Sequence, residues 1–453
     1  SSTELAEALI ASNKRWGLFA GDDVRRWSRG KSVAIIAGQQ CGFAGGPLYT
    51  LVKLATLVRM KRDNEARGIP TTLFFWLATE DHDFAEAASI ALPAGDPRAQ
   101  RDLVYLRAAR AVETRDVVGP LPVPPVLIDE LLAFFDMPRP PWLREGITFR
   151  DSFAELIAGV FPRDVVLVDA LLPELRRAGA PLFEAIVAND VQGALASRAA
   201  ELERAGYTPQ VTPRENGQYT LLYEIDDRGN RDITDKLPEP ECTSTSALTR
   251  PLLQDFVLQP DVFVGGPAEV AYYAQIAPLH EMLGVTMPRV ALRAHALVAP
   301  RRVARAVERY DIKPEEIFTG VDELLAEREP ESVAKIRGIA ERGRRELTEV
   351  FTQIGDVALP ADHAIARRVS RSIGHIEYHF ERLAERARRA LVRHDRERYA
   401  AARELVATLY PDRHVQDRIV GWIADWMELG QHLVERLVEE VEPDSATCKI
   451  VEI

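Results

Sequence analysis

The stretch SVAIIAGQQCGFAGGPLYTLVKLATLVRM, residues 32–60, decides the fold of this chain. Its apolar run at 33–37 predicts a buried parallel strand, which leads into a glycine-rich loop at 38–46. Pro47 then opens a helical stretch, since proline is favoured at the first position of a helix. A second apolar strand follows at 71–78, so the order strand–helix–strand predicts a βαβ unit of a doubly wound sheet.

A second unit with the same order of elements lies at 261–298, with its last strand predicted at 288–298. Its strand leads into Gly-Gly-Pro at 265–267, and the first unit has Gly-Gly-Pro at 45–47. Ligands bind at the carboxyl ends of strands in open α/β sheets. We therefore expect Gly46 and Gly266 to line a common pocket, the alternative being two ordinary strand-to-helix turns.

The rest of the chain divides around these units into a core and an arm. We expect an α/β core over residues 1–300, with a further strand at 165–170. Two irregular stretches interrupt the core as insertions, at 93–145 and at 208–245. The second has turn signals and short alternating runs, which predict a small β structure.

A long helical arm is predicted over residues 301–410. Apolar residues from Ile365 to Leu391 recur at steps of three and four, which is typical of a coiled-coil seam. A preceding helical stretch at 331–355 would complete an antiparallel hairpin that pairs two subunits through this seam. Residues 411–453 are expected to form a C-terminal helix, at 414–440, and a tail that packs back on the core.

Composition excludes several classes of protein. The 453 residues carry 57 basic and 69 acidic side chains, and the net charge of −12 disfavours nucleic acid and anionic membranes as partners. No apolar run approaches the ~20 residues that a membrane span needs. The first residues form an amphipathic helical pattern rather than a signal peptide. Three scattered cysteines indicate reduced thiols, so we expect a cytoplasmic protein.

The glycine-rich loop is the first candidate binding site. A helix N-terminus presents free N–H groups and a positive dipole end, which favour a phosphate or a carboxylate. Lysine is rare here, with eight in the chain, and Lys53 lies on the same helix face as Gly46 and Thr50. A surface lysine is the alternative. The loop matches neither a Walker A motif nor GxGxxG, and nothing predicts a redox cofactor. The candidates for binding substrate or nucleotide here are Gln39, Gln40, Gly45, Gly46, Tyr49, Thr50 and Lys53.

The second candidate is the acidic segment TEDHDFAE at 79–86, which follows the strand at 71–78. Its carboxylates surround one imidazole, so His82 fits a general acid/base oriented by Asp81 and Asp83. The same oxygens could hold a divalent metal such as Mg²⁺, and an acidic loop that caps a helix is a third interpretation. No residue is assigned as a metal ligand. Glu80 and Trp76 complete the candidates at this strand end.

The third group comes from the second half of the core. Arg250, in STSALTRPLLQD, could pair with a carboxylate or a phosphate, and a surface arginine is the alternative. Glu269 follows the second Gly-Gly-Pro turn, where a carboxylate stabilises the first helical turn as readily as it contacts a substrate. Gly265 and Gly266 are the candidate residues of that turn.

These motifs resemble one known family. AGQQCGFAGGPLYTLVK, FFWLATEDHDFAE, STSALTRPLLQD, VFVGGPAEVAYYAQ and LYPDRHVQDR are similar, in this order, to the bacillithiol biosynthesis cysteine-adding enzymes. The resemblance runs from about residue 33 to the C-terminus. It implies an α/β fold with a Rossmann-like parallel sheet core, inserted connecting segments, and a long antiparallel coiled-coil arm that forms a homodimer.

The resemblance also implies a reaction. The family's enzymes are expected to join the carboxyl of cysteine to the amine of glucosaminyl malate, the last step of bacillithiol biosynthesis. ATP would be the activating donor by analogy with other cysteine ligases. The alternatives are a dimeric nucleotide- or thiol-binding scaffold without turnover, and a nucleotidyltransferase, which would release pyrophosphate without requiring an amino acid.

Overall fold

The computed structural model describes most of the chain. The described residues are 2–94, 102–109, 115–210, 221–234, 236–309, 311–318, 320, 331–360, 364–394 and 396–453. Parts of both predicted insertions lie outside these ranges. The chain forms two compact units, one of residues 1–94, 103–298 and 416–453, and one of residues 95–102 and 299–415.

A five-stranded parallel sheet forms the centre of the first unit, as the α/β prediction requires. The strand order is β10-β9-β1-β2-β5, and every pair of neighbours is parallel. The strands are β1 (Val33–Gln39), β2 (Thr71–Leu77), β5 (Val166–Asp169), β9 (Val262–Gly265) and β10 (Arg289–Leu292). From β1 the chain proceeds to β2 and β5 on one side, and β9 later adds on the other side. The strand order therefore reverses between β1 and β9, where open α/β sheets bind ligands.

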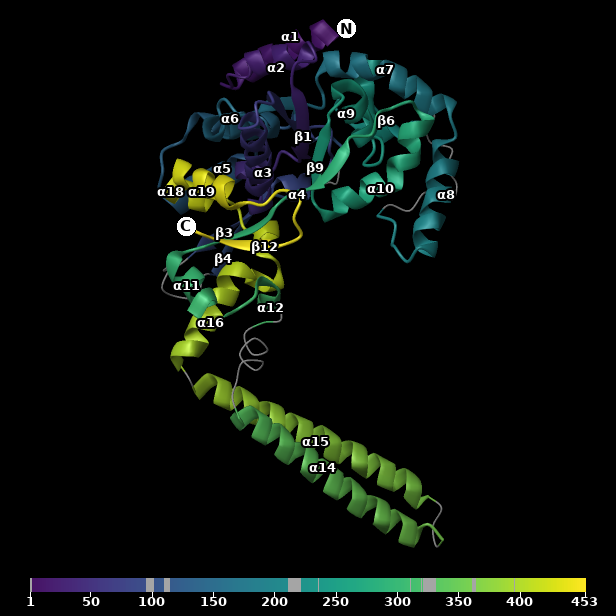
Figure 1. Cartoon of the computed structure of the whole chain (residues 1–453), viewed down its shortest axis with the longest axis vertical. Helices are drawn as coiled ribbons and strands as arrows, with labels where there is room; N and C mark the ends of the chain where they lie inside the picture. The colour runs from purple at the N-terminus through teal and green to yellow at the C-terminus, as the bar shows by residue number, and fades with distance from the viewer. Residues whose placement is uncertain are drawn as a thin grey trace. The chain divides into compact units, whose positions relative to one another are not determined.

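Both faces of this sheet are buried, because successive side chains of a strand point to opposite faces. Ile35 packs with α3 (Leu48–Glu65) in one hydrophobic cluster, and Ile36 belongs to the cluster on the other face. In Figure 1, α3 lies to one side of β1 and β9, and α9 and α10 lie to the other. The helices that contribute to the second cluster are α1 (Ser2–Arg15), α2 (Gly21–Ser28), α7 (Pro173–Ala188), α8 (Val191–Arg204), α9 (Arg250–Leu258) and α10 (Pro267–Met282).

The predicted insertions contain short elements. A three-stranded antiparallel sheet lies at the expected β insertion, with the order β7-β6-β8. A two-stranded sheet of β3 and β4 follows the acidic segment. The elements here are α4 (Phe84–Ala87), β3 (Ser89–Ala94), β4 (Asp102–Arg107), α5 (Pro125–Phe135), α6 (Phe149–Val160), β6 (Leu222–Ile225), β7 (Arg231–Ile233) and β8 (Thr243–Thr245), with 3₁₀ turns η1 (Phe43–Gly45), η2 (Pro141–Leu143) and η3 (Pro240–Cys242).

Two expectations about regular elements are wrong. The predicted strand at 288–298 breaks at Arg293, where its backbone N–H bonds to Gly265, into β10 and β11 (His295–Ala299). The predicted helix at 414–440 is three short helices, because Gly430 adopts a positive φ of 55° and ends one of them. The C-terminal elements are α17 (Gln416–Ile419), α18 (Ile423–Leu429), α19 (Gln431–Glu440) and β12 (Cys448–Glu452), which pairs with β11.

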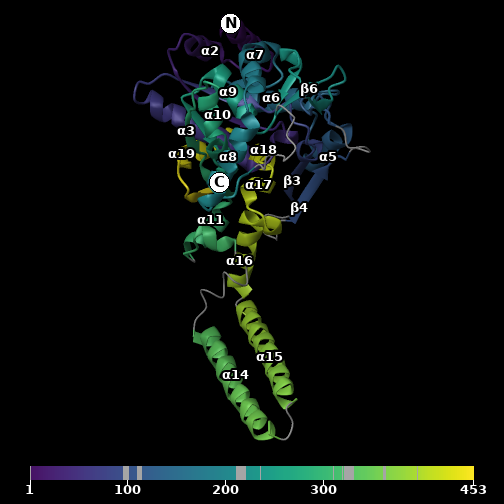
Figure 2. The same cartoon turned by 90° about the vertical axis from the view of Figure 1, so that its right-hand side faces the viewer.

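The second unit contains the predicted helical hairpin. Helices α14 (Glu331–Ala358) and α15 (Ile365–His394) lie side by side in Figures 1 and 2. Phe380 packs at Gly343 and Val369 packs at Gly355, so the two helices run antiparallel. Among the described residues, no helix is both long and apolar enough to cross a membrane. The unit's other elements are α11 (Arg301–Arg309), α12 (Pro314–Ile317), α16 (Arg396–Leu409) and η4 (Pro411–Arg413).

Candidate active site

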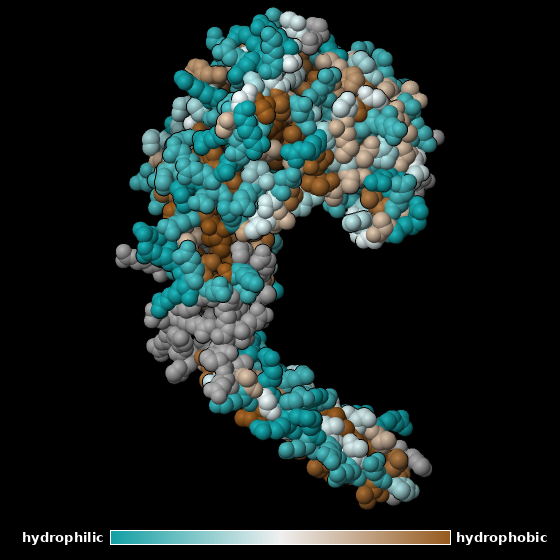
Figure 3. Space-filling model, viewed as in Figure 1, coloured by the Kyte–Doolittle hydropathy of each residue, from teal (hydrophilic) through white to brown (hydrophobic). Residues whose placement is uncertain are grey.

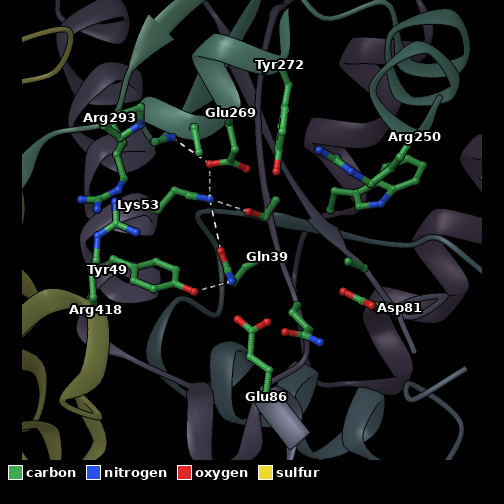
Figure 4. Close-up of a pocket in the computed structure, with 17 residues that line it drawn as sticks. Gln39, Tyr49, Lys53, Asp81, Glu86, Arg250, Glu269, Tyr272, Arg293 and Arg418 are labelled. Atoms are coloured by element: carbon green, nitrogen blue, oxygen red, sulfur yellow. Dashed lines mark hydrogen bonds and ion pairs between the residues drawn. The ribbon is translucent and has the colours of Figure 1, made fainter. Parts of the chain in front are cut away.

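A cavity of about 390 Å³ opens at the carboxyl ends of the sheet strands, on the side where the strand order reverses. Figure 4 shows Lys53 between Glu269 and Gln39, with Arg293 and Arg418 on one side and Arg250 on the other. The lining residues are Gly38, Gln39, Gln40, Tyr49, Lys53, Trp76, Ala78, Asp81, Glu86, Arg250, Gly266, Pro267, Ala268, Glu269, Tyr272, Arg293 and Arg418.

An ion pair between Lys53 and Glu269 joins the two Gly-Gly-Pro units. The Lys53 Nζ lies 2.8 Å from Glu269 Oε2 and donates to the Gly38 carbonyl at 2.7 Å. Its side chain is 2% exposed, and this burial lowers the pKa of Lys53 against the opposing effect of Glu269. Burial would raise the pKa of Glu269, but Lys53 and the Gly266 N–H outweigh it and hold that pKa below 4.5. Glu269 therefore caps helix α10 and also walls the cavity.

Tyr49 and Gln39 connect this ion pair to the cavity floor. The Gln39 Nε2 donates to the Tyr49 hydroxyl at 2.9 Å, and Lys53 donates to the Gln39 Oε1 at 3.2 Å. Burial and the nearby Glu86 carboxylate raise the pKa of Tyr49 to about 12, so its phenol keeps its proton at neutral pH. Side chains from β1 and from the first turns of α3 are thus held in a fixed arrangement at the cavity.

Three guanidinium groups supply positive charge. Arg293 is buried and already bound, with Nη2 2.8 Å from Asp417 Oδ2. Arg250 donates to the Gln254 side chain at 3.3 Å. Within the part of the chain that the structure describes, neither Arg250 nor Arg418 forms an ion pair. Two guanidinium groups without acidic partners in one cavity are suited to bind a carboxylate or a phosphate.

The acidic segment does not act as one cluster, because its backbone turns. Glu80 is buried and bound on several sides, by Arg176 at 2.8 Å and by the Ser244 hydroxyl at 2.7 Å. Burial alone would raise the pKa of Glu80, but Arg176, Arg231 and the hydroxyls of Thr245 and Ser244 hold it below 4.5. Glu80 follows β2 and accepts hydrogen bonds from Ser244 and Thr245 of β8, so it links the two strands. It does not line the cavity.

The other members of the segment point in different directions. Asp81 and Glu86 line the cavity, whereas His82 and Asp83 do not. Asp83 caps α4 by accepting the Glu86 N–H at 2.9 Å. The half-exposed His82 ring has its Nδ1 3.1 Å from Arg231 Nη1. His82 therefore does not line the cavity. For an acid/base role on a bound ligand, Asp81 and Glu86 are better placed than His82.

Among the glycines, the second turn contributes more to the cavity than the first. Gly266 lines the cavity, but Gly45, Gly46 and Gly265 do not. Gly45 adopts a φ of 87°, and an added Cβ would lie 2.4 Å from Trp422. The first turn therefore packs against the C-terminal segment, and only one member of the expected pair, Gly46 and Gly266, faces the ligand space.

Two cavity-wall side chains and one buried residue complete the candidates. Trp76 is buried in the wall, and its Nε1 has no hydrogen-bond partner among the described residues. Gln40 donates to the Asp83 carbonyl at 3.2 Å. Thr50 is buried outside the lining, and within the same part of the chain its hydroxyl also has no partner. The described residues include no group of three or more His, Cys, Asp or Glu that could hold a metal ion.

Comparison with known proteins identifies the family. Residues 1–236 and 230–294 match the model described as Bacillithiol biosynthesis BshC, N-terminal Rossmann-like domain. Residues 296–453 match the C-terminal coiled-coil domain of the same family. The chain belongs to the BshC family. This confirms the resemblance and the fold class, a Rossmann-like α/β core with a coiled-coil arm.

Curated BshC relatives resemble the chain along most of its length. One from Koribacter versatilis is 32% identical, over 96% of this chain and 87% of that protein. Relatives from Solibacter usitatus and Heliobacterium modesticaldum are 29% and 30% identical, each over 93% of this chain. All three carry the name "putative cysteine ligase BshC". The BshC family is thus a family of ligases by the names of its curated members.

Four polar or charged side chains that line this BshC cavity are not among the site residues predicted from the sequence: Tyr272, Arg293, Arg418 and Glu86. Of these, Glu86 enters the prediction only as part of the acidic segment. Arg293 and its partner Asp417 are 124 positions apart, so no local pattern joins them. The signal that could have found Arg418 is the motif LYPDRHVQDR at 409–418, one of the motifs that carry the family resemblance.

Proposed function

We propose that this cavity is the active site of an amide-forming ligase. The enzyme would join the carboxyl of cysteine to the glucosamine amine of glucosaminyl malate, the last step of bacillithiol biosynthesis. Family membership supports the reaction class. The observation that carries the proposal is the pairing of Arg250 and Arg418, which lack acidic partners, with the carboxylates Asp81 and Glu86 in one cavity.

The charges match the substrates. The malate group carries two carboxylates, which the guanidinium groups of Arg250 and Arg418 can bind by charge-assisted hydrogen bonds. The amine of the sugar is the nucleophile, and a carboxylate in the cavity can accept its proton. An amide does not form spontaneously from a free carboxylate in water, so the cysteine carboxyl needs a leaving group. We propose ATP as its donor, which gives an acyl phosphate or an acyl adenylate.

A direct assay tests this function. The protein is incubated with cysteine, ATP, Mg²⁺ and glucosaminyl malate, and bacillithiol is sought by mass spectrometry. Wild type and the matched control Arg204→Ala, an exposed arginine outside the cavity, should form product. Arg250→Ala should reduce kcat/KM by ~10-fold or more, because a charge-assisted hydrogen bond is lost. Ligand binding without product from any phosphate donor would favour the scaffold instead, and pyrophosphate release without cysteine would favour a nucleotidyltransferase.

We also propose that the arm forms a homodimer. Part of the predicted seam, including Val369 and Phe380, packs inside the hairpin. Leu383 and Leu391 of the seam are exposed on α15, and further exposed apolar residues form a stripe on α14. Figure 3 shows apolar atoms on the hairpin surface. This α14 stripe consists of Leu347, Val350, Ile354 and Val357. Its steps of three and four fit a coiled-coil contact with a second copy.

The double variant Val350→Asp and Ile354→Asp should sediment as a monomer. Two carboxylates in an apolar helical contact cost several kcal/mol, whereas on an exposed helix they cost little. Unchanged circular dichroism would show that the hairpin stays folded. A variant that remains dimeric would place the interface elsewhere.

The state of the three cysteines bears on the cellular compartment. Among the described residues, Cys41, Cys242 and Cys448 form no disulfide. Free thiols persist in reducing compartments. We therefore propose that the reaction takes place in the cytoplasm.

A further inference from the structure

A second cavity adjoins the first. It measures about 360 Å³, and the two share the side chains of Tyr49, Glu86 and Arg418. Apart from this shared wall, its lining includes Ile90, Ile419 and Arg107. Each cavity is at the small end of the range for ligand sites, which is roughly 300–1,000 Å³. Each therefore suits one small substrate.

The shared wall is built from segments far apart in sequence. The Leu48 N–H donates to the Val420 carbonyl at 2.8 Å, and the Gly421 N–H donates to the Ala91 carbonyl at 2.8 Å. The C-terminal segment thus runs between the start of α3 and strand β3, and this position brings Arg418 to both cavities. An added Cβ at Gly421 would lie 2.4 Å from Ile90, so the segment is closely packed there.

The two cavities differ in chemistry. The first has the guanidinium group of Arg250 and shares that of Arg418 with the second, so two guanidinium groups are available to a dicarboxylate. The second has apolar Ile90 and Ile419 beside the guanidinium of Arg107, which lies over the Tyr105 ring at 4.5 Å. A short apolar side chain with an adjacent carboxylate fits this second lining, and cysteine has that form.

Glu86 lies where the two cavities meet. Figure 4 shows its carboxylate turned toward Gln39 and Tyr49. Among the described residues, this carboxylate makes no hydrogen bond or ion pair, so it is available to a ligand. Partial burial, with the Asp83 and Asp81 carboxylates nearby, raises the pKa of Glu86 above 4.5, which makes it a stronger base than an ordinary glutamate.

We propose that the two cavities are the two substrate subsites of one ligase site, and that Glu86 accepts the proton of the attacking amine. This inference rests on the proposed function. The first cavity holds glucosaminyl malate by its carboxylates. The second holds cysteine, with its carboxyl toward Arg107 and its side chain against Ile90 and Ile419.

The step balances as follows in atoms and charge. The sugar nitrogen attacks the carbonyl carbon of the cysteinyl phosphate or adenylate, and a C–N bond forms. The C–O bond to the activating group breaks, and phosphate or AMP leaves with that electron pair. The proton of the nitrogen passes to the Glu86 carboxylate, which later releases it to water. Arg418, on the shared wall, stabilises the charge on the departing phosphate.

The first experiment addresses Glu86. Glu86→Gln should lower kcat by ~10²–10⁴-fold, while Kd for each substrate stays within about threefold, because the amide keeps size and polarity. Glu130→Gln, an exposed residue of α5, is the matched control and should behave as wild type. The acidic limb of the wild-type kcat profile should lie above pH 4.5 and disappear in Glu86→Gln. The other ionisable groups facing Glu86 are Tyr49, Arg418, Arg107, Asp81 and Asp83.

The second experiment addresses the subsites by calorimetry, which needs no turnover. Cysteine should bind protein saturated with glucosaminyl malate. Arg107→Ala should weaken cysteine about tenfold and leave glucosaminyl malate unchanged, and Arg250→Ala should do the reverse. Competition between cysteine and glucosaminyl malate for binding would overturn the proposal of two separate subsites. The role of Glu86 would be overturned if Glu86→Gln kept more than a tenth of the wild-type kcat. It would also be overturned if kcat fell by ~10²-fold or more in His82→Asn and not in Glu86→Gln.

The two proposals fail in different ways. A wild-type protein that makes no amide from any phosphate donor refutes the proposed function and, with it, the role of Glu86. Simultaneous binding of cysteine and glucosaminyl malate would then still support the two subsites, and mutual exclusion would overturn them.

Discussion

The two Gly-Gly-Pro turns have the same sequence and different uses. In the first, the Gly45 carbonyl accepts a hydrogen bond from Trp422 Nε1 at 3.0 Å, and the turn packs against the C-terminal segment. In the second, Gly266 faces the cavity and its N–H bonds to Glu269 at 2.7 Å. One turn thus holds the protein together, and the other lines the ligand space.

The difference shows what such a motif determines. In both units it marks the carboxyl end of a strand, because glycine and proline end a strand and begin a helix there. It does not determine which atoms face the ligand. The first unit supplies Tyr49 and Lys53 from within its helix, and the second supplies the turn itself and Glu269. Lys53 and Glu269 then join the units across the switch point.

The largest expected effect comes from breaking this connection. Lys53→Met should lower the free energy of unfolding by about 3 kcal/mol, since removal of one partner leaves Glu269 uncompensated. Urea denaturation measures this loss. The same variant should bind glucosaminyl malate at least tenfold more weakly by calorimetry, because Lys53 also holds Gln39 in the cavity wall.

A second partly buried pair provides the control. Lys61 also lies on α3, with its Nζ 2.8 Å from Asp23, and it lines neither cavity. Lys61→Met should therefore lower stability without changing the Kd for glucosaminyl malate. Equal losses of affinity in both variants would mean that Lys53 acts on the ligand only through the stability of α3.

A smaller loss of stability should distinguish the two Gly-Gly-Pro turns when a glycine of each is changed to alanine. Gly45→Ala should cost about 2 kcal/mol, because the residue has a positive φ and the methyl group would meet Trp422. Gly266→Ala should cost less than ~1 kcal/mol, since its φ of −73° suits alanine and its nearest neighbours lie 3.5 Å away. The affinity for glucosaminyl malate should instead fall more in Gly266→Ala than in Gly45→Ala. Thermal unfolding with calorimetry of glucosaminyl malate tests this, and similar stability losses would contradict it.

The sequence predicts the centre of the fold well because the decisive signals are local. An apolar run of strand length, a glycine loop and a helix opened by Pro47 lie within 30 residues, and β1, α3 and β2 follow that pattern. The prediction of a single C-terminal helix is wrong for two reasons. The close contact of Gly421 with Ile90 depends on distant packing, which hydrophobic periodicity does not report. The break at Gly430 is a local glycine helix end with a positive φ, which the apolar spacing also does not report.

The residues of the candidate site also differ in how well the sequence predicts them. Residues near the first strand, such as Gln39, Tyr49 and Lys53, reach the cavity because their positions follow from β1 and α3. The adjacency of its residues predicts that the acidic segment forms one cluster. Its backbone turns instead, so Glu80 is buried on Arg176 and Asp81 faces the cavity. Adjacency in sequence is a poor guide to orientation outside regular elements.

The smallest expected effect is a change in pH dependence. The folded-state pKa of Glu269 lies below 4.5, chiefly because Lys53 outweighs the effect of burial. The stabilisation by this carboxylate is therefore fully present above pH 4.5 and is lost as the pH falls through the lower, folded-state value. Glu269→Gln takes up no proton, so its free energy of unfolding should fall less steeply below pH 4.5 than that of wild type.

Urea denaturation at several pH values below 4.5 measures the two slopes. Glu65→Gln, which removes an exposed carboxylate at the end of α3, should follow wild type. Lys53 does not confuse the result, because its amine stays protonated throughout this acidic range. Parallel curves for Glu269→Gln and wild type would mean that the charge of Glu269 contributes nothing in solution. The two Gly-Gly-Pro units would then be held together by the strand pairing of β1 with β9 and by packing alone.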